Sequence, residues 1–126
     1  MSHSADLGFG IVGTGMIGEF HARAIKEARD ARLVGIADIA EGKARQFALR
    51  HDVGFWTMQV ADLAARPDID VICITTPSGA HLEPALEAVH AGKHVIVEKP
   101  IEVTLERVDA LLRAADLAGV FVGAIL

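Results

Sequence analysis

The 126-residue chain is long enough to bury one sizeable hydrophobic core but not two. Hydrophobic residues make up 52% and charged residues 23% of the sequence, a balance typical of a soluble globular domain. The formal net charge of −5 gives no indication of a nucleic acid or an anionic membrane as partner. No apolar run reaches the ~18 residues that a membrane span needs, and no leader pattern opens the sequence, so we expect a cytoplasmic protein without a membrane partner.

Strand-like and helix-like patterns alternate along the chain. In chain order, the sequence predicts a strand over 7–12, a helix over 16–28, a strand over 33–37, a helix over 41–49, a short strand over 54–56, a brief helix over 60–65, a strand over 71–75, a helix over 82–92, a strand over 94–98, a helix from an N-cap at Thr104 to Gly119, and a strand over 120–123. The apolar positions expected to face the core from the first helix are Ile17, Phe20, Ala24, Ile25 and Ala28. Six strands with helical crossovers predict an α/β fold: a doubly wound parallel sheet forming one domain over residues 1–126.

The first loop carries the most informative motif, Gly13-Thr14-Gly15-Met16-Ile17-Gly18. It lies between a strand and a helix, and Asp38 ends the second strand twenty positions after Gly18. In this setting Gly13 permits a tight turn, Gly15 lets backbone amides approach a pyrophosphate, and Gly18 lets the helix pack closely on the strand. The helix N-terminus would face the phosphates and Asp38 the adenosine ribose. The pattern predicts a Rossmann-type dinucleotide-binding domain.

Two later strands end in loops that should reach the same edge of the sheet. The first loop runs from Thr75 to His81, and the second contains Glu98-Lys99-Pro100. Adjacent charges at the end of a buried strand are costly to desolvate without partners. Pro100 restricts the backbone of Lys99, whose side chain could hydrogen-bond a substrate hydroxyl beside a nicotinamide. A surface salt bridge at the strand end remains the alternative interpretation.

These motifs together resemble the Gfo/Idh/MocA family of glucose–fructose oxidoreductases and inositol dehydrogenases. The sequence from about Leu7 to Gly123 is similar to the N-terminal cofactor domain of that family, and the Glu98-Lys99-Pro100 triplet after an apolar strand is the most specific element. The resemblance implies NAD(P)-dependent oxidation or reduction of a secondary alcohol on a sugar or cyclitol.

The resemblance also implies roles for individual residues. Met16 and Ile17 of the glycine loop would hold the pyrophosphate, Asp38 the adenosine ribose, and Glu98 and Lys99 the nicotinamide ribose and substrate. The residues implied on the nicotinamide side are Thr76, Pro77, Ser78 and His81. The full set of cofactor-binding candidates is Gly13, Gly15, Met16, Ile17, Gly18, Asp38, Thr75, Thr76, Pro77, Ser78, His81, Glu98 and Lys99. Lys99 is the catalytic candidate.

Family members continue into a second domain that supplies a general acid/base, most of the sugar pocket and the oligomer interface, and the sequence ends at Leu126. We therefore expect at most feeble activity from these residues alone, and a sugar or cyclitol as partner only if a second domain is supplied. Edges left uncovered could favour a homo-oligomer. The alternatives are a dinucleotide-binding module without activity and a methyltransferase that uses S-adenosylmethionine, although the Glu98-Lys99-Pro100 triplet argues against the latter.

Cofactor choice rests on Asp38, which would repel a 2′-phosphate, so we predict NAD over NADP. Lys43 and Arg45 lie close enough in sequence to weaken that prediction.

The remaining histidines and the cysteine have simpler interpretations. The residues expected to be solvated on helices are His21, His51 and His90, and His94 is expected to be structural. For His81 a role at the cofactor and a role at a helix start compete equally. Cys73 is expected to be buried in a strand, and no spacing of ligand residues predicts a metal site.

Overall fold

The computed structural model describes residues 6–76, 82–98 and 105–125. Its strands are β1 (Leu7–Val12), β2 (Ala31–Ala37), β3 (Phe55–Thr57), β4 (Val71–Ile74), β5 (His94–Glu98) and β6 (Val122–Ile125). Its helices are α1 (Met16–Glu27), α2 (Glu41–Arg50), α3 (Val60–Ala64), α4 (Leu82–His90) and α5 (Leu105–Ala118). The strands form one parallel sheet in the order β3-β2-β1-β4-β5-β6. This is the doubly wound α/β fold that the alternating pattern predicts.

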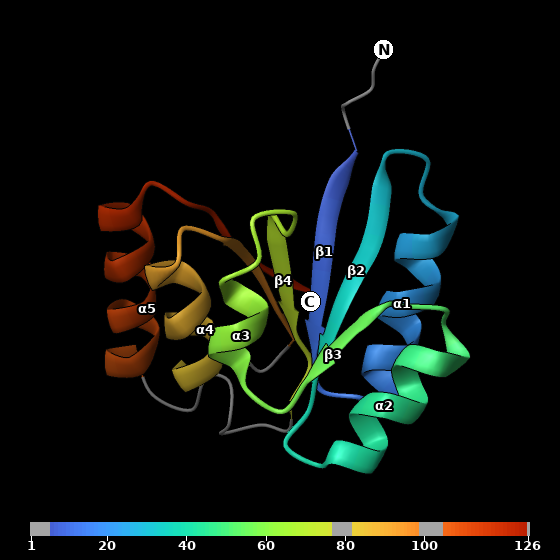
Figure 1. Ribbon diagram of the computed structural model, residues 1–126. Coiled ribbons are helices and arrows are strands. Elements are labelled where there is room, and N and C mark those ends of the chain that lie inside the picture. Colours follow the sequence, from blue (N-terminus) through green and yellow to red (C-terminus); the bar gives the residue numbers. More distant parts are fainter. Residues whose placement is uncertain (1–5, 77–81, 99–104, 126) are drawn as a thin grey trace.

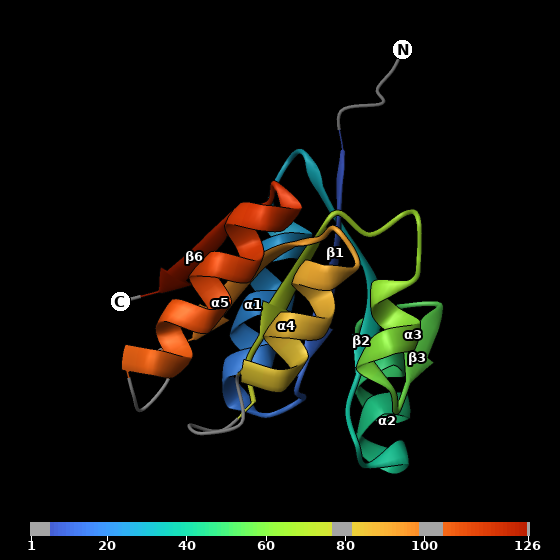
Figure 2. The ribbon, with the colours of Figure 1, turned by 90° about the vertical axis from the view of Figure 1, so that its left-hand side faces the viewer.

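The helices cover both faces of the sheet. Figure 1 shows α1 and α2 on one side and α3, α4 and α5 on the other, and Figure 2 shows α4 and α5 in front of the sheet with α1 behind it. Each face has its own hydrophobic core. Alternation along β5 separates the two faces, since Val95 and Val97 pack with the α4–α5 side while Ile96 packs with the α1–α2 side. Side chains two residues apart therefore point to the same helix layer.

The predicted elements are found at the predicted places, with small shifts at their ends. β5 has the predicted bounds, whereas β6 begins two residues later than expected. The predicted N-cap Thr104 lies outside the described residues.

The face of α1 that packs on the sheet differs from the prediction. Of the predicted positions Ile25 is buried, together with Gly18 and Ala22, whereas Phe20 is 58% and Ile17 39% exposed. Ala24 and Ala28 are exposed as well. The physical reason is the close approach at Gly18, where a Cβ atom would lie 2.4 Å from the carbonyl oxygen of Gly13. That contact sets the rotation of the helix, and the apolar side chains one position away turn outward.

The strand order changes direction between β1 and β4: β2 and β3 follow on the far side of β1, and β5 and β6 on the far side of β4. The carboxyl ends of β1 and β4 lie side by side at the lower edge of the sheet in Figure 1, and a change of direction of this kind is where such sheets bind ligands. Among the described residues, no helix has the length and the apolar character that crossing a membrane requires.

Candidate functional site

A cleft of about 940 Å³ lies at the carboxyl edge of the sheet, across the point where the strand order changes direction. The predicted site residues in its wall are Gly13, Gly15, Met16, Ile17, Asp38, Thr75, Thr76 and Glu98. Other residues in the wall are Val12, Thr14, Ala37, Ile39, Ala40, Lys43, Met58 and Val60. The ends of β1, β2, β4 and β5 thus contribute to one cleft.

The glycine loop has the backbone geometry that the motif predicts. Gly13 has φ of +101°, in the left-handed region that a residue with a side chain rarely adopts. A Cβ atom on Gly15 would meet no other atom within 4 Å, so the space above this residue is open. Gly18 is buried behind the loop and is absent from the cleft wall, in line with the packing role expected of it.

The N-terminus of α1 opens onto this empty space. Gly15 is the N-cap residue, and no side chain in the described part of the chain caps the helix there. The first turn of the helix therefore directs backbone N–H groups and the positive end of the helix dipole into the cleft. These features suit a pyrophosphate, whose negative oxygens would accept hydrogen bonds from the backbone.

Thr75 supports the glycine loop from the neighbouring strand. Its hydroxyl donates to the carbonyl oxygens of Val12 at 2.9 Å and Gly13 at 3.0 Å, and its backbone N–H donates to Val12 at 2.8 Å. The sequence motif assigned Thr75 to the cofactor, and the geometry shows in addition that it ties the loop after β1 to the end of β4.

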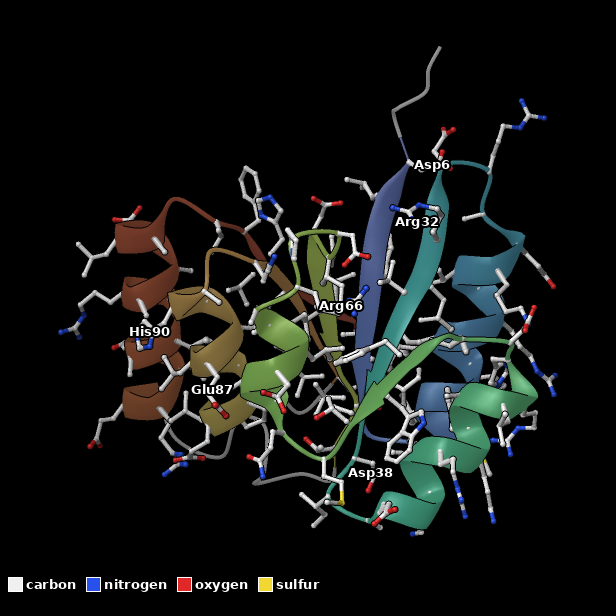
Figure 3. The ribbon with its side chains drawn as sticks, in the orientation of Figure 1. Asp6, Arg32, Asp38, Arg66, Glu87 and His90 are labelled. Atoms are coloured by element: carbon white, nitrogen blue, oxygen red, sulfur yellow. The ribbon has the colours of Figure 1, made fainter. Side chains whose placement is uncertain are left out.

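Asp38 lies in the cleft wall at the carboxyl end of β2 (Figure 3). Its Oδ2 accepts hydrogen bonds from the hydroxyl of Thr14 at 2.8 Å and the backbone N–H of Thr14 at 3.1 Å. Its Oδ1 accepts one from the backbone N–H of Ala40 at 2.9 Å. The carboxylate is therefore fixed at the mouth of the cleft, with Lys43 also in the wall.

His21 was expected to be a solvated helix residue, and this prediction is wrong. Its Nε2 lies 2.6 Å from Oε2 of Glu98, and the two side chains are only 12% and 17% exposed. His21 belongs to the buried stripe of α1, since it follows Gly18 by three residues and precedes Ile25 by four. That spacing is the signal that could have found it.

His51 was also expected to be solvated and is instead buried. Its Nε2 lies 2.8 Å from Oε1 of Glu19, and its ring packs against Phe47 with centroids 4.6 Å apart. The hydrogen bond from His51, with further ones from Arg23 and Arg50, lowers the pKa of Glu19 to about 2. This cluster joins the start of α1 to the end of α2 behind the cleft.

The positions of His90, His94 and Cys73 agree with the predictions made for them. His90 is exposed, and His94 accepts a hydrogen bond of 3.1 Å from the backbone N–H of Phe121 through Nδ1. Cys73 is buried in β4, and burial, with a smaller effect from Glu98, raises the pKa of its thiol to about 12. The described residues contain no group of three or more side chains placed to hold a metal ion.

Four of the predicted site residues lie outside the described part of the chain: Pro77, Ser78, His81 and Lys99. Sequence reasoning missed the apolar side chains of Ile39, Met58 and Val60 in the cleft wall. No local pattern points to Met58 or Val60, because they reach the site only through the pairing of β3 with β2.

Comparison with known proteins identifies the family that the sequence motifs resemble. Residues 7–125 match the Gfo/Idh/MocA family, described as "Oxidoreductase family, NAD-binding Rossmann fold". Inositol 2-dehydrogenase of Rhizobium meliloti is 38% identical over 108 residues, which are 86% of this chain and 32% of that protein. 2,7-anhydro-N-acetylneuraminate hydratase of Mediterraneibacter gnavus is 32% identical over 114 residues, covering 90% of this chain and 30% of that protein.

A solved structure gives the same result at the level of the fold. Scyllo-inositol dehydrogenase from Lactobacillus casei, crystallised with NAD(H) and scyllo-inositol, superposes with a TM-score of 0.86 at 27% identity. The match covers 94% of this chain and 36% of that one. The chain thus spans about a third of the length of the curated relatives and solved structures that it matches.

Proposed function

The chain belongs to the Gfo/Idh/MocA oxidoreductase family and has its NAD-binding Rossmann fold, and from this premise we propose that it is the cofactor half of a sugar or cyclitol dehydrogenase. The observation that carries the proposal is the convergence of Gly13, Asp38 and Glu98 on one cleft. They come from three strands, and each stands where one part of a dinucleotide would need it.

The walls of the cleft fit an extended dinucleotide. The open space at Gly15 and the uncapped start of α1 suit the pyrophosphate. Asp38 would accept a hydrogen bond from the adenosine ribose, and the apolar side chains of Ile39 and Met58 would contact the adenine. Glu98, from β5, would accept a hydrogen bond from the ribose at the nicotinamide end.

NAD supplies the hydride acceptor when it is bound. The residues of the chain would hold the cofactor in place and provide charged side chains beside it. Lys99, directly after Glu98 in the sequence, is proposed to hydrogen-bond the substrate hydroxyl. Because the matched residues make up about a third of the relatives, we propose that the sugar pocket and the general acid/base are supplied from outside residues 7–125. The substrate class follows the relatives, two of which are named as inositol dehydrogenases.

We further propose that the cleft prefers NAD to NADP. A 2′-phosphate would meet the carboxylate of Asp38, which Thr14 and Ala40 hold in place. The repulsion between the two negative groups disfavours NADP. Lys43 in the same wall would offset part of that repulsion.

Calorimetric titration of the chain with NADH tests the proposal. We expect saturable binding of NADH at one site, weaker binding of NADPH, and no binding of S-adenosylmethionine. Tight binding of S-adenosylmethionine without binding of NADH would overturn the proposal and favour a methyltransferase.

A second assay tests whether the general acid/base comes from outside these residues. The absorbance of NADH is followed while the chain is mixed with NAD and myo-inositol. The chain alone should give no alcohol-dependent rise. A rise at the rate of an ordinary enzyme would contradict the proposal that the acid/base comes from outside these residues.

A further inference from the structure

The hydrogen bond between His21 and Glu98 joins two elements that lie on the same side of the sheet. Alternation along β5 sends Val95 and Val97 toward α4 and α5, and it sends Ile96 and Glu98 toward α1. His21 belongs to the stripe of α1 that packs on this face. The distance of 2.6 Å between Nε2 and Oε2 is that of a strong hydrogen bond to a carboxylate.

The two side chains have different access to the cleft. Glu98 is part of the cleft wall, whereas His21 is absent from it and stands behind Glu98. His21 is therefore not one of the residues that line the cleft. Its hydrogen bond to Glu98 connects it to the cleft wall.

Both side chains are largely withdrawn from water, with 12% of His21 and 17% of Glu98 exposed. A carboxylate in such surroundings needs hydrogen-bond donors, because water no longer supplies all of them. The imidazole supplies one through Nε2–H to Oε2. This contact restrains the side-chain torsions of Glu98 and leaves Oε1 to accept a hydrogen bond from the cleft.

We propose that His21 is a positioning residue for the cofactor: it holds one carboxylate oxygen of Glu98 so that the other is presented to a hydroxyl of the nicotinamide ribose. This inference rests on the proposed binding of NAD(H) in the cleft. It assigns a function to a helix residue that sequence reasoning had placed in solvent.

The test compares NADH with ADP, which lacks the nicotinamide ribose. In His21→Leu the dissociation constant for NADH should rise about tenfold, the factor expected for loss of a charge-assisted hydrogen bond. The dissociation constant for ADP should stay unchanged, because ADP lacks the ribose that Glu98 would contact. A merely structural role of His21 would weaken both ligands alike, and that result would overturn the inference.

A double-mutant cycle then asks whether His21 acts through Glu98. Glu98→Ala should weaken NADH binding, and adding His21→Leu to it should cause no further loss. Additive losses would overturn the inference while leaving the proposed function intact. Failure of the unmutated chain to bind NADH would instead overturn the proposed function, and this inference with it.

A conservative variant distinguishes loss of the hydrogen bond from a folding defect. His21→Gln places an amide N–H near the position of Nε2 and should recover most of the affinity lost in His21→Leu. The imidazole ¹H–¹⁵N spectrum of His21, which needs no cofactor, should shift in Glu98→Ala. If Gln binds NADH no better than Leu while both variants remain folded by circular dichroism, the hydrogen bond does not position Glu98.

Discussion

The hydroxyl of Thr14 donates a hydrogen bond of 2.8 Å to Oδ2 of Asp38, linking the glycine loop to the end of β2. The backbone N–H of Thr14 donates to the same oxygen, and that of Ala40 donates to Oδ1. A carboxylate offers about four acceptor positions, so these donors leave roughly one, on Oδ1. The loop that would hold the pyrophosphate therefore also orients the carboxylate that would hold the ribose.

Replacing Thr14 tests this link between the two halves of the cleft. Thr14→Val keeps the shape and the backbone donor but removes the hydroxyl, and we expect NADH affinity to fall by about two- to tenfold, the equivalent of roughly 0.5–1.5 kcal/mol. Thr14→Ser, which keeps the hydroxyl, should bind as the unmutated chain does. Titration by fluorescence energy transfer to bound NADH measures both. Unchanged or tighter binding by the Val variant would show that Asp38 needs no restraint from Thr14.

Asp38 should control the choice between NADH and NADPH. The unmutated chain should prefer NADH by at least about tenfold, a factor that needs only about 1.4 kcal/mol of repulsion between the carboxylate and a 2′-phosphate. Asp38→Ala should shift the balance towards NADPH, because Lys43 remains in the cleft wall. Competition between the two cofactors in calorimetry gives the ratio. Equal affinities in the unmutated chain would contradict the predicted preference.

A substitution of Lys43 provides the matched control for the Asp38 variant. In the Asp38→Ala background, Lys43→Ala should remove the gain in NADPH affinity while changing NADH affinity little. If the gain persists, a different group receives the 2′-phosphate.

We expect Gly15 to be needed for ligand binding and Gly18 to be needed for the stability of the fold. Gly15 has φ of −81°, which alanine adopts readily, and a Cβ atom there would meet nothing within 4 Å. Gly15→Ala should therefore leave the melting temperature unchanged and weaken NADH binding by tenfold or more, since roughly 1.4 kcal/mol of steric conflict with the pyrophosphate suffices. Thermal unfolding with and without NADH measures both effects. A lower melting temperature without the ligand would contradict the assignment.

Gly18→Ala should have the opposite result. Its Cβ atom would lie 2.4 Å from the carbonyl oxygen of Gly13, so α1 must move away from the loop. We expect a loss of about 1–3 kcal/mol in the free energy of unfolding, the cost typical of overpacking. Urea titration checks it. A variant as stable as the unmutated chain would show that α1 shifts at no cost.

The order of the elements and most of the described cleft could be predicted from the sequence. Parallel strands present their carboxyl ends at one edge, so the positions of Gly13, Asp38 and Glu98 along the chain were enough to place them together. The side chain that meets Glu98 could not be predicted from hydrophobicity. The packing of α1 is set by backbone contact at Gly18, and that contact turns His21 inward and Phe20 outward.

The burial of His51 escaped prediction from the sequence for a different reason. A histidine at the end of a helix is usually solvated, but here Glu19 of another helix and Phe47 of its own surround it. The spacing of four residues between Phe47 and His51 is a local signal for their contact. The carboxylate of Glu19 is a tertiary partner from a distant part of the chain, and no local spacing indicates it.

The pair formed by Glu19 and His51 should make the stability of the fold depend on pH in the acid range. The pKa of Glu19 is about 2 in the folded chain, compared with 4.5 for an unperturbed glutamate, so the folded state binds a proton there less readily than the unfolded state does. The contribution of Glu19 to stability is therefore fully present above pH 4.5 and is lost as the pH falls towards 2. Glu19→Gln, which cannot ionise, should lack this contribution.

Urea unfolding between pH 7 and pH 2 checks the prediction. At pH 7 the Gln variant should be less stable by about 1 kcal/mol, the size typical of a partly exposed ion pair, and the difference should shrink through the window from 4.5 to 2. Glu27→Gln, which removes an exposed carboxylate from the same helix, is the matched control and should follow the unmutated chain. If the Glu19→Gln variant instead lost stability in parallel with the unmutated chain across that window, the acid sensitivity would arise from other carboxylates, and the contact between α1 and α2 would depend on packing around Phe47 rather than on charge.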